Sequence, residues 1–278
     1  DYKIVCPSYT MLRDGHVCDD CLTGSVSNAF RHRCQQGDTF KSLLLSLEAY
    51  WQKFAQNYAM LDCIIAPSEF MRQTLLRKLP RSRIDVIVNG IDASTTVPGD
   101  TAGDYFLYIG RLSREKGVAT LALAQQKMQQ SMPLKIVGDG PLGSDLRARF
   151  SGPEFLGYMR HGEALNALIR GARAVIVPSE YYENCSMSVL EAMAFGRPVV
   201  GGNIGGIPEQ IRDGIDGYLV EPGDADALAR IMDSLAANPQ QAREMGINAR
   251  QRLEDKYDLA RHMQVLQELY QQLVGEAK

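Results

Sequence analysis

The sequence predicts an α/β protein whose C-terminal part is a doubly wound parallel sheet. From about residue 105, short β-branched or aromatic runs alternate with helix-length amphipathic stretches. The runs are almost continuously apolar, which is typical of strands that helices cover on both faces. The chain has 278 residues, of which 45% are hydrophobic and 23% charged, and this suits a globular protein of two domains.

The expected elements follow this alternation. Strands are expected at 105–110, 134–138, 174–178, 198–202 and 217–220, and helices at 117–131, 142–150, 163–172, 186–195 and 206–213. After residue 220 the alternation stops, and helices are expected over 224–237, 239–256 and 258–275. Asp224 fits a helix N-cap better than a metal ligand, and Pro208 fits the first turn of a helix.

A shorter α/β pattern precedes residue 105, with strands expected at 2–5, 63–66 and 84–88 and a helix from Glu69. Residues 89–104 have no periodicity, which indicates a linker. We therefore expect a partial N-terminal α/β domain over 1–95, a C-terminal sheet domain over 96–257, and a last helix, 258–278, that packs back toward the N-terminal domain. Because "DYKIVC" enters a strand-like run without a start methionine, we expect that an N-terminal part is missing.

Charge and hydropathy limit the partners. The net charge of −3 argues against nucleic-acid binding. No apolar run reaches the ~18 residues of a membrane span and no secretory signal is visible, so a cytoplasmic location is expected. The stretch 39–60 indicates one long helix, with an apolar stripe made of Leu44, Leu47, Trp51, Phe54 and Tyr58. The stripe fits a core or domain-packing face, or else peripheral contact with the inner face of the membrane.

Four of the six cysteines, Cys6, Cys18, Cys21 and Cys34, lie in the first 34 residues. A disulfide framework is not expected in a chain of this length without an export signal. The Cys18-x-x-Cys21 spacing fits half of a structural zinc site, and Cys34 with either Cys6 or a histidine (His16 or His32) could complete it. Four reduced thiols around a loop are the alternative, because a second Cys-x-x-Cys is absent.

The glycines of "IVGDGPLG" have the spacing Gly-x-Gly-x-x-Gly at Gly138, Gly140 and Gly143. They follow the second expected strand of their domain rather than the first, and no acidic residue ends a strand about 20 positions later. A dehydrogenase is therefore disfavoured. Gly138 and Gly140 are expected to let the backbone pass close to a flat ligand or a neighbouring helix.

The first strand-turn-helix of the domain, "YFLYIGRLSREKG", carries Gly110, Arg111 and Lys116. A glycine at a strand end and two cations before a helix N-terminus predict a phosphate site, with solvated surface cations as the alternative.

In 178–200, Glu183 precedes a helix and Glu191 lies inside it, with the helix N-terminal amides between them. Such a pair suits the hydroxyl-bearing ends of a ligand with an anionic middle. Alternatively, Ser188 and Glu191 form a capping box and Glu183 is a surface acid.

Taken together, "YIGRLSREKG", "IVGDGP", "FLGYM", "VPSEYYENCSMSVLEAMAFGRPVV" and "GIPEQIRDGIDGYLVEPGD" resemble the retaining glycosyltransferases of the GT-B fold, group 1 or family 4 type, with the signature Glu-x7-Glu. The resemblance implies two Rossmann-like domains. The C-terminal one would bind a UDP- or GDP-linked sugar, and the N-terminal one a saccharide or lipid-linked acceptor. It implies a hexosyltransferase of cell-surface polysaccharide synthesis.

The resemblance also implies roles for residues. Arg111 and Lys116 would hold the donor diphosphate, Glu183 would contact the transferred sugar, and Glu191 would bind the ribose. The turn 155–159 lies where the family seats the base. The implied donor-binding residues are Gly110, Gly138, Gly140, Leu156, Tyr158, Asn184, Cys185, Ser186, Met187, Ser188 and Glu191. Because the cations stabilise the leaving diphosphate, no metal or other cofactor is expected in catalysis.

The N-terminal part resembles a subgroup with a CP…CxxC…C loop, in which a catalytic histidine commonly precedes a pair like Asp1-Tyr2. Since the chain starts at Asp1, that histidine is absent from it. A non-catalytic nucleotide-sugar-binding fragment is therefore the second hypothesis.

Overall fold

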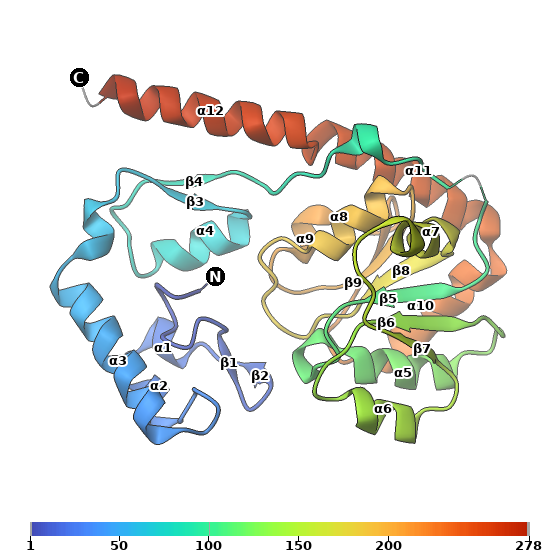
Figure 1. Cartoon of the computed structure of the whole chain (residues 1–278), viewed down its shortest axis with the longest axis horizontal. Coiled ribbons are helices and arrows are strands. Elements are labelled where there is room, and N and C mark those ends of the chain that lie inside the picture. The colour runs from blue at the N-terminus through green and yellow to red at the C-terminus, as the bar shows by residue number, and fades with distance from the viewer. Residues whose placement is uncertain (1, 100, 277–278) are drawn as a thin grey trace. The chain divides into compact units, whose positions relative to one another are not determined.

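A computed structural model describes residues 2–99 and 101–276 (Figure 1). The chain divides into two compact units: unit 1 comprises Asp1–Val88 and Val265–Lys278, and unit 2 comprises Asn89–Gln264. Among the helices of the described chain, none combines the length and the apolar composition of a membrane-spanning segment.

Unit 2 is built on a six-stranded parallel sheet in the order β10-β9-β8-β5-β6-β7. Its strands are β5 (Phe106–Ile109), β6 (Leu134–Val137), β7 (Glu154–Gly157), β8 (Ala174–Val177), β9 (Val199–Gly202) and β10 (Gly217–Val220). The first strand, β5, lies inside the sheet, and later strands are added on both sides of it. The doubly wound sheet that the sequence predicts is therefore confirmed.

The strand β7 was not predicted, since 155–159 was expected to be a turn. Residues Glu154–Gly157 pair with β6, and the loop begins only at Tyr158. β7 is an edge strand that begins with an exposed acid and ends with a glycine. It therefore lacks the continuous apolar run by which the inner strands are recognised.

Helices cover both faces of this sheet (Figure 1). On one face lie α5 (Val118–Lys127), α6 (Gly143–Arg149) and α10 (Ala225–Ala237). On the other lie α7 (Glu163–Gly171), α8 (Met187–Ala194), α9 (Ile207–Gln210) and α11 (Pro239–Lys256). Apolar side chains of α5, α6 and α10 pack on Phe106, Ile136 and Val200 to form the core. Asp224 caps α10 through the amide of Ala227, as predicted.

Unit 1 contains a short hairpin and a small parallel sheet. The hairpin pairs β1 (Leu12–Arg13) with β2 (His16–Val17), and the sheet pairs β3 (Ile64–Ala66) with β4 (Ile84–Val86). Its helices are α1 (Asp20–Thr23), α2 (Asn28–Arg31), α3 (Thr39–Phe54) and α4 (Glu69–Leu76). The last helix, α12 (Leu259–Glu276), reaches unit 1, where Arg83 pairs with Glu276 at 3.1 Å.

Two expectations for unit 1 are wrong. Residues 2–5 form a turn rather than a strand, closed by the amides of Val5 and Cys6 on the carbonyl of Tyr2; Asp1 lies outside the described residues. The helix expected over 39–60 ends at Phe54, because Gln56 adopts a left-handed conformation (φ 51°) before the 3₁₀ turn η1 (Asn57–Met60). Four residues of the predicted stripe, Leu44, Leu47, Trp51 and Phe54, are exposed and so belong to no core of the described chain.

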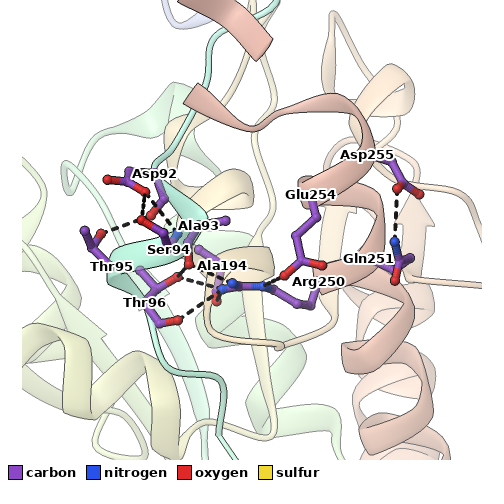
Figure 2. A network of polar contacts seen from close by, with 10 residues as sticks. All are labelled: Asp92, Ala93, Ser94, Thr95, Thr96, Ala194, Arg250, Gln251, Glu254 and Asp255. Atoms are coloured by element: carbon purple, nitrogen blue, oxygen red, sulfur yellow. Dashed lines mark hydrogen bonds and ion pairs between the residues drawn. The ribbon is translucent and has the colours of Figure 1, made fainter. Parts of the chain in front are cut away.

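Residues 93–96, which contain the 3₁₀ turn η2 (Ala93–Thr95), are held by Arg250 of α11 (Figure 2). Its guanidinium donates to the carbonyl of Ala93 at 2.7 Å, to the hydroxyl of Thr96 at 2.7 Å and to the carbonyl of Ala194, and it pairs with Glu254 at 2.6 Å. One arginine therefore links the turn at Ala93 and Thr96 to the carbonyl of Ala194 at the end of α8.

We expect Arg250→Ala to lower the free energy of unfolding of unit 2 by about 2–4 kcal/mol, because the carbonyl of Ala194 loses its donor and the turn at Ala93 and Thr96 loses its link to it. Urea unfolding followed by circular dichroism measures the change. Arg243→Ala, on an exposed side of the same helix, is the matched control and should stay within about 0.5 kcal/mol of the parent. Equal effects of the two variants would contradict this role.

Candidate functional site

The strand order of unit 2 reverses between β5 and β8, which lie side by side and run parallel. The segment after β5 (110–117) leads through the 3₁₀ turn η3 (Arg114–Lys116) to α5 on one face of the sheet, and the segment after β8 (178–186) leads to α8 on the other. The two segments touch, since the amide of Glu180 donates to the carbonyl of Glu115 at 2.8 Å, and then continue to opposite faces of the sheet. Open α/β sheets have their ligand-binding crevice at such a switch point, outside the carboxyl ends of the strands. Seven predicted site residues lie on these two segments: Gly110, Arg111, Lys116, Glu183, Asn184, Cys185 and Ser186.

Lys116 and Glu183 meet at this point as an ion pair. The ammonium of Lys116 lies 2.6 Å from Oε1 of Glu183 and donates to the hydroxyl of Tyr181 at 2.9 Å. The hydroxyl of Ser179 donates to the same carboxylate oxygen at 3.1 Å. Burial raises the pKa of Tyr181, with the charge of Glu183 adding to it, so this phenol stays neutral. The carboxylate, which is only 11% exposed, is thus oriented from several sides.

The backbone around Glu183 is fixed by the loop that follows β9. The amide of Gly206 donates to the carbonyl of Glu183 at 2.6 Å. A Cβ on Gly205 would lie 2.5 Å from the carbonyl oxygen of Glu183, and one on Gly206 would lie 2.0 Å from that of Asn184. The two loops can approach this closely only because both residues are glycines. The side-chain Oδ1 of Asn184 is buried and has no hydrogen-bond partner among the described residues.

The N-terminus of α8 is partly occupied by Gln210, a residue that the sequence analysis missed. The amide of Ser186 donates to Oε1 of Gln210 at 2.8 Å, and Nε2 of Gln210 donates to the carbonyl of Ser186 at 3.0 Å. The Ser186 amide is therefore paired with a side chain of the protein, whereas the sequence analysis took the amides at this helix start as free. The hydroxyl of Ser188 donates to the carbonyl of Ile109 at 3.3 Å rather than forming a capping box with Glu191.

A cavity of about 350 Å³ lies at the carboxyl ends of β5, β6 and β7. Its lining residues are Ile109, Gly110, Arg111, Val137, Gly138, Asp139, Tyr158, Met159, His161 and Leu165. Four predicted residues are among them: Gly110, Arg111, Gly138 and Tyr158. Leu156 and Gly140 are not.

At Gly138 and Gly140 the backbone packs closely against another loop. One of our expectations was close packing against a neighbouring helix instead. A Cβ on Gly138 (φ +139°) would lie 1.8 Å from the carbonyl oxygen of Gly110, and one on Gly140 would lie 2.5 Å from that of Leu112. The segment after β6 therefore lies directly on the segment after β5.

Glu191 of α8 faces His161, which is one of the residues that line the cavity and was not predicted. Nδ1 of His161 lies 3.9 Å from Oε1 of Glu191. Burial raises the pKa of Glu191, and His161 opposes this shift. Burial also raises the pKa of Cys185 to about 11, so its thiol stays protonated near neutral pH. Met187, the first residue of α8, is exposed.

Models of two protein families match the chain. The model described as Glycosyl transferases group 1 matches residues 98–252, and the one described as Glycosyltransferase Family 4 matches residues 30–95. The first match alone covers more than half of the chain. The chain belongs to the group 1 glycosyltransferase family.

Individual relatives agree with this assignment. The chain is 29% identical over 246 residues to alpha-maltose-1-phosphate synthase of Mycolicibacterium smegmatis, covering 76% of the chain and 63% of the relative. It is 35% identical over 190 residues to glycogen synthase of Mycobacterium tuberculosis, covering 64% of the chain and 45% of the relative. The chain thus spans about half to two thirds of the length of these relatives.

Among solved structures, sucrose-phosphate synthase from Thermosynechococcus elongatus superposes with a TM-score of 0.70 and 28% identity, over 77% of this chain and 59% of that one. HepE of Anabaena in complex with UDP superposes with a TM-score of 0.72 and 20% identity, over 85% of this chain and 69% of that one. The GT-B type of fold that the resemblance implied is confirmed.

We expect Gly138→Ala to destabilise unit 2 by more than about 3 kcal/mol, because its Cβ would collide with the backbone of Gly110. The control is Gly223→Ala, where φ is also positive (+81°) but the space around the added Cβ is open. That variant should lose only about 1–2 kcal/mol, the cost of a left-handed backbone. Urea unfolding measures both, and equal losses would contradict the loop-on-loop contact.

Proposed function

We propose that this family member is a retaining glycosyltransferase that moves a hexosyl group from a UDP- or GDP-sugar to a saccharide or lipid-linked acceptor in cell-surface polysaccharide synthesis. The observation that carries the proposal is the ion pair of Lys116 and Glu183 at the switch point of the sheet. At this point a cation that can bind phosphate is hydrogen-bonded to a carboxylate that can accept hydrogen bonds from sugar hydroxyls.

The diphosphate of the donor would lie against Arg111 and Lys116. Arg111 is exposed at the mouth of the cavity, and Lys116 keeps 28% of its side chain exposed, so both can reach an incoming anion. As the bond between sugar and diphosphate breaks, negative charge grows on the leaving group. Fixed cations stabilise this charge without proton transfer, and we therefore propose that transfer needs no metal ion.

Glu183 would contact the transferred sugar. Its carboxylate is held by Ser179 as well as by Lys116, so it stays oriented when Lys116 turns toward phosphate. The buried oxygen of Asn184, in the next residue, has no described partner and can accept a hydrogen bond from a ligand donor. In this arrangement the carboxylate orients the sugar and offsets the positive charge that develops at its anomeric carbon.

The nucleoside would occupy the cavity at the ends of β5, β6 and β7. Its volume of about 350 Å³ accommodates a ribosyl base, and Tyr158 and Met159 supply apolar surface. Glu191 lies at 3.9 Å from the cavity residue His161 and would accept hydrogen bonds from the ribose hydroxyls. Structural neighbours that were crystallised with UDP and with UDP-glucose support this class of donor.

We expect Lys116→Ala to lower the rate of transfer by about 10²–10³-fold, because one charged contact to the leaving diphosphate is lost. Glu183→Ala should impair transfer without weakening nucleoside-diphosphate binding, whereas Glu191→Ala should weaken that binding by about 10–100-fold. A thermal-shift panel of nucleoside diphosphates and their sugars, followed by a transfer assay, measures both effects.

Lys127→Ala is the matched control for this series, since Lys127 is paired with Asp226 at 2.6 Å at the far end of α5. Parental turnover of Glu183→Ala would contradict the proposal. Donor binding without turnover, both in this chain and in a version extended at its N-terminus, would favour a non-catalytic binding function instead.

The raised pKa of Glu191 predicts a pH dependence of donor binding. If ribose hydroxyls donate to its carboxylate, binding favours the ionised form and lowers the pKa in the complex. Affinity should then be constant above the raised pKa and should fall as the pH drops through it. Isothermal titration from about pH 8 to about pH 4.5 tests this against Glu191→Gln. The ionisation of the phosphate is common to both proteins, so identical pH profiles would contradict the role of Glu191.

A further inference from the structure

The segment 183–186 is held at both of its ends by one other stretch of the chain, the loop after β9 together with α9. At the first end, the amide of Gly206 donates to the carbonyl of Glu183 at 2.6 Å. At the last end, the carboxamide of Gln210 pairs with both backbone polar groups of Ser186. Its Oε1 accepts from the amide at 2.8 Å, and its Nε2 donates to the carbonyl at 3.0 Å. The two contacts enclose Glu183 and Asn184.

Gln210 supplies hydrogen bonds that the sequence of α8 itself does not supply. Ser186 is the N-cap of α8, with an extended backbone (φ −71°, ψ 118°), and no side chain caps the helix there. In a capping box, the amide of the N-cap residue is bonded by a glutamate or glutamine three positions later. That position is Val189, whose side chain is apolar. The conformation of Ser186 is therefore fixed by a residue 24 positions further along the chain.

Gln210 is itself firmly placed. It is only 1% exposed, and its carbonyl accepts from Nε of Arg252 at 2.6 Å. The carbonyl of Glu209 accepts from the same guanidinium at 2.7 Å and from the hydroxyl of Tyr257 at 2.8 Å. The carboxamide has one favourable orientation, because its oxygen faces a donor of Ser186 and its nitrogen faces an acceptor. Turning it over would leave buried polar groups without partners, which costs free energy.

The body of α8 is held in a different way. Five side chains of the helix are buried in unit 2: Val189, Leu190, Ala192, Met193 and Ala194. This packing fixes the axis of the helix, and with it the place of Glu191, without help from Gln210. The contacts of Gln210 with Ser186 and Cys185 concern only the residues before the first helical turn.

We propose that Gln210 is a positioning residue for the transfer reaction. This role rests on the proposed function, in which Glu183 and Asn184 meet the transferred sugar. By fixing Ser186, the carboxamide keeps the carboxylate of Glu183 and the buried oxygen of Asn184 in place for the sugar. Gln210 acts through the backbone of Ser186 and not by touching the ligand. Small displacements of groups that orient a reacting centre lower the rate much more than they weaken binding elsewhere.

Gln210→Met tests the role, because methionine has a similar length but makes neither hydrogen bond. We expect kcat to fall by about 10–100-fold. The Kd of the nucleoside diphosphate should stay within about threefold of the parent, since the residues assigned to that part of the donor, Arg111, Lys116 and Glu191, form no hydrogen bond with Gln210 in the described chain. Steady-state kinetics and isothermal titration with UDP and with GDP measure the two effects.

Gln241→Met is the matched control. Gln241 is a half-buried glutamine of α11 whose Nε2 donates to the hydroxyl of Tyr218 at 2.9 Å, away from Ser186. This variant loses one side-chain hydrogen bond of the same unit and should keep the parental kcat.

Hydrogen exchange gives a measurement that does not depend on a folded variant. In the parent chain, the amide of Ser186 should exchange at least about tenfold more slowly than the amides of Met187 and Ser188. Those two amides have no acceptor in the part of the chain that the structure describes. Exchange followed by NMR on the ¹⁵N-labelled chain resolves the three positions. In Gln210→Met the protection of Ser186 should disappear, while that of Val175 in β8 stays.

The outcomes separate this role from the proposed function. Parental kcat in Gln210→Met, equal losses of kcat and of nucleoside-diphosphate binding, or an amide of Ser186 that exchanges as fast as that of Met187 would each overturn the role of Gln210 alone. No turnover by the parent, either as this chain or extended at its N-terminus, would overturn the proposed function and this role together.

Discussion

The parallel pairing of β5 with β8 is the constraint on which the rest of unit 2 depends. β5 is the first strand of the sheet, and the chain adds β6 and β7 on one side before α7 carries it back to β8 on the other. Because the connections of both halves are wound in the same sense, the helices that follow β5 and β8 cover opposite faces. The segments that follow these two strands continue to opposite faces from this place. Lys116 and Glu183, which are 67 residues apart in sequence, meet there at 2.6 Å.

Backbone-to-backbone packing keeps the loops of this crevice in place. Gly117, which adopts a positive φ of +67°, lies so close to the carbonyl of Pro178 that a Cβ would be 1.8 Å from its oxygen. The contacts of Gly138 with Gly110 and of Gly205 with Glu183 are of the same kind. Such contacts involve no side chains whose rotamers have to be fixed. They therefore hold the loops of a site in position with less conformational adjustment than contacts of long polar side chains would need.

The parts of the structure that the sequence predicts are those with a local physical signature. The inner strands carry continuous apolar runs, and Asp224 and Pro208 mark the start of their helices by capping chemistry. β7 was missed because it begins with an exposed acid and ends with a glycine, while residues 2–5 were mispredicted because "YKIV" is mostly apolar but pairs with no strand in the described chain. Local composition does not determine whether a neighbouring strand is available for pairing.

The same distinction separates the predicted site residues from the missed ones. Arg111, Lys116 and Glu183 stand beside a strand end or a helix start, so their place follows from the order of elements. Gln210 and His161 act through contacts with Ser186 and Glu191, which are 24 and 30 positions away. Only the folded chain brings these partners together. Gln210 lies in a helix of a single turn, which is too short to give a periodic pattern in the sequence.

The ion pair of Lys116 with Glu183 also determines what an anionic ligand has to do on entry. The ammonium of Lys116 is neutralised by a carboxylate that is only 11% exposed. A diphosphate that takes over Lys116 would leave this carboxylate without its counter-charge, unless the ligand supplies hydroxyl donors to it. The phosphates of a nucleoside diphosphate only accept hydrogen bonds and its ribose hydroxyls are assigned to Glu191, so at Glu183 only the sugar of a nucleoside-diphosphate sugar would supply such donors. The pair would therefore favour the complete donor over the product nucleotide, and the discrimination would arise from the charge on Glu183 rather than from the size of the cavity.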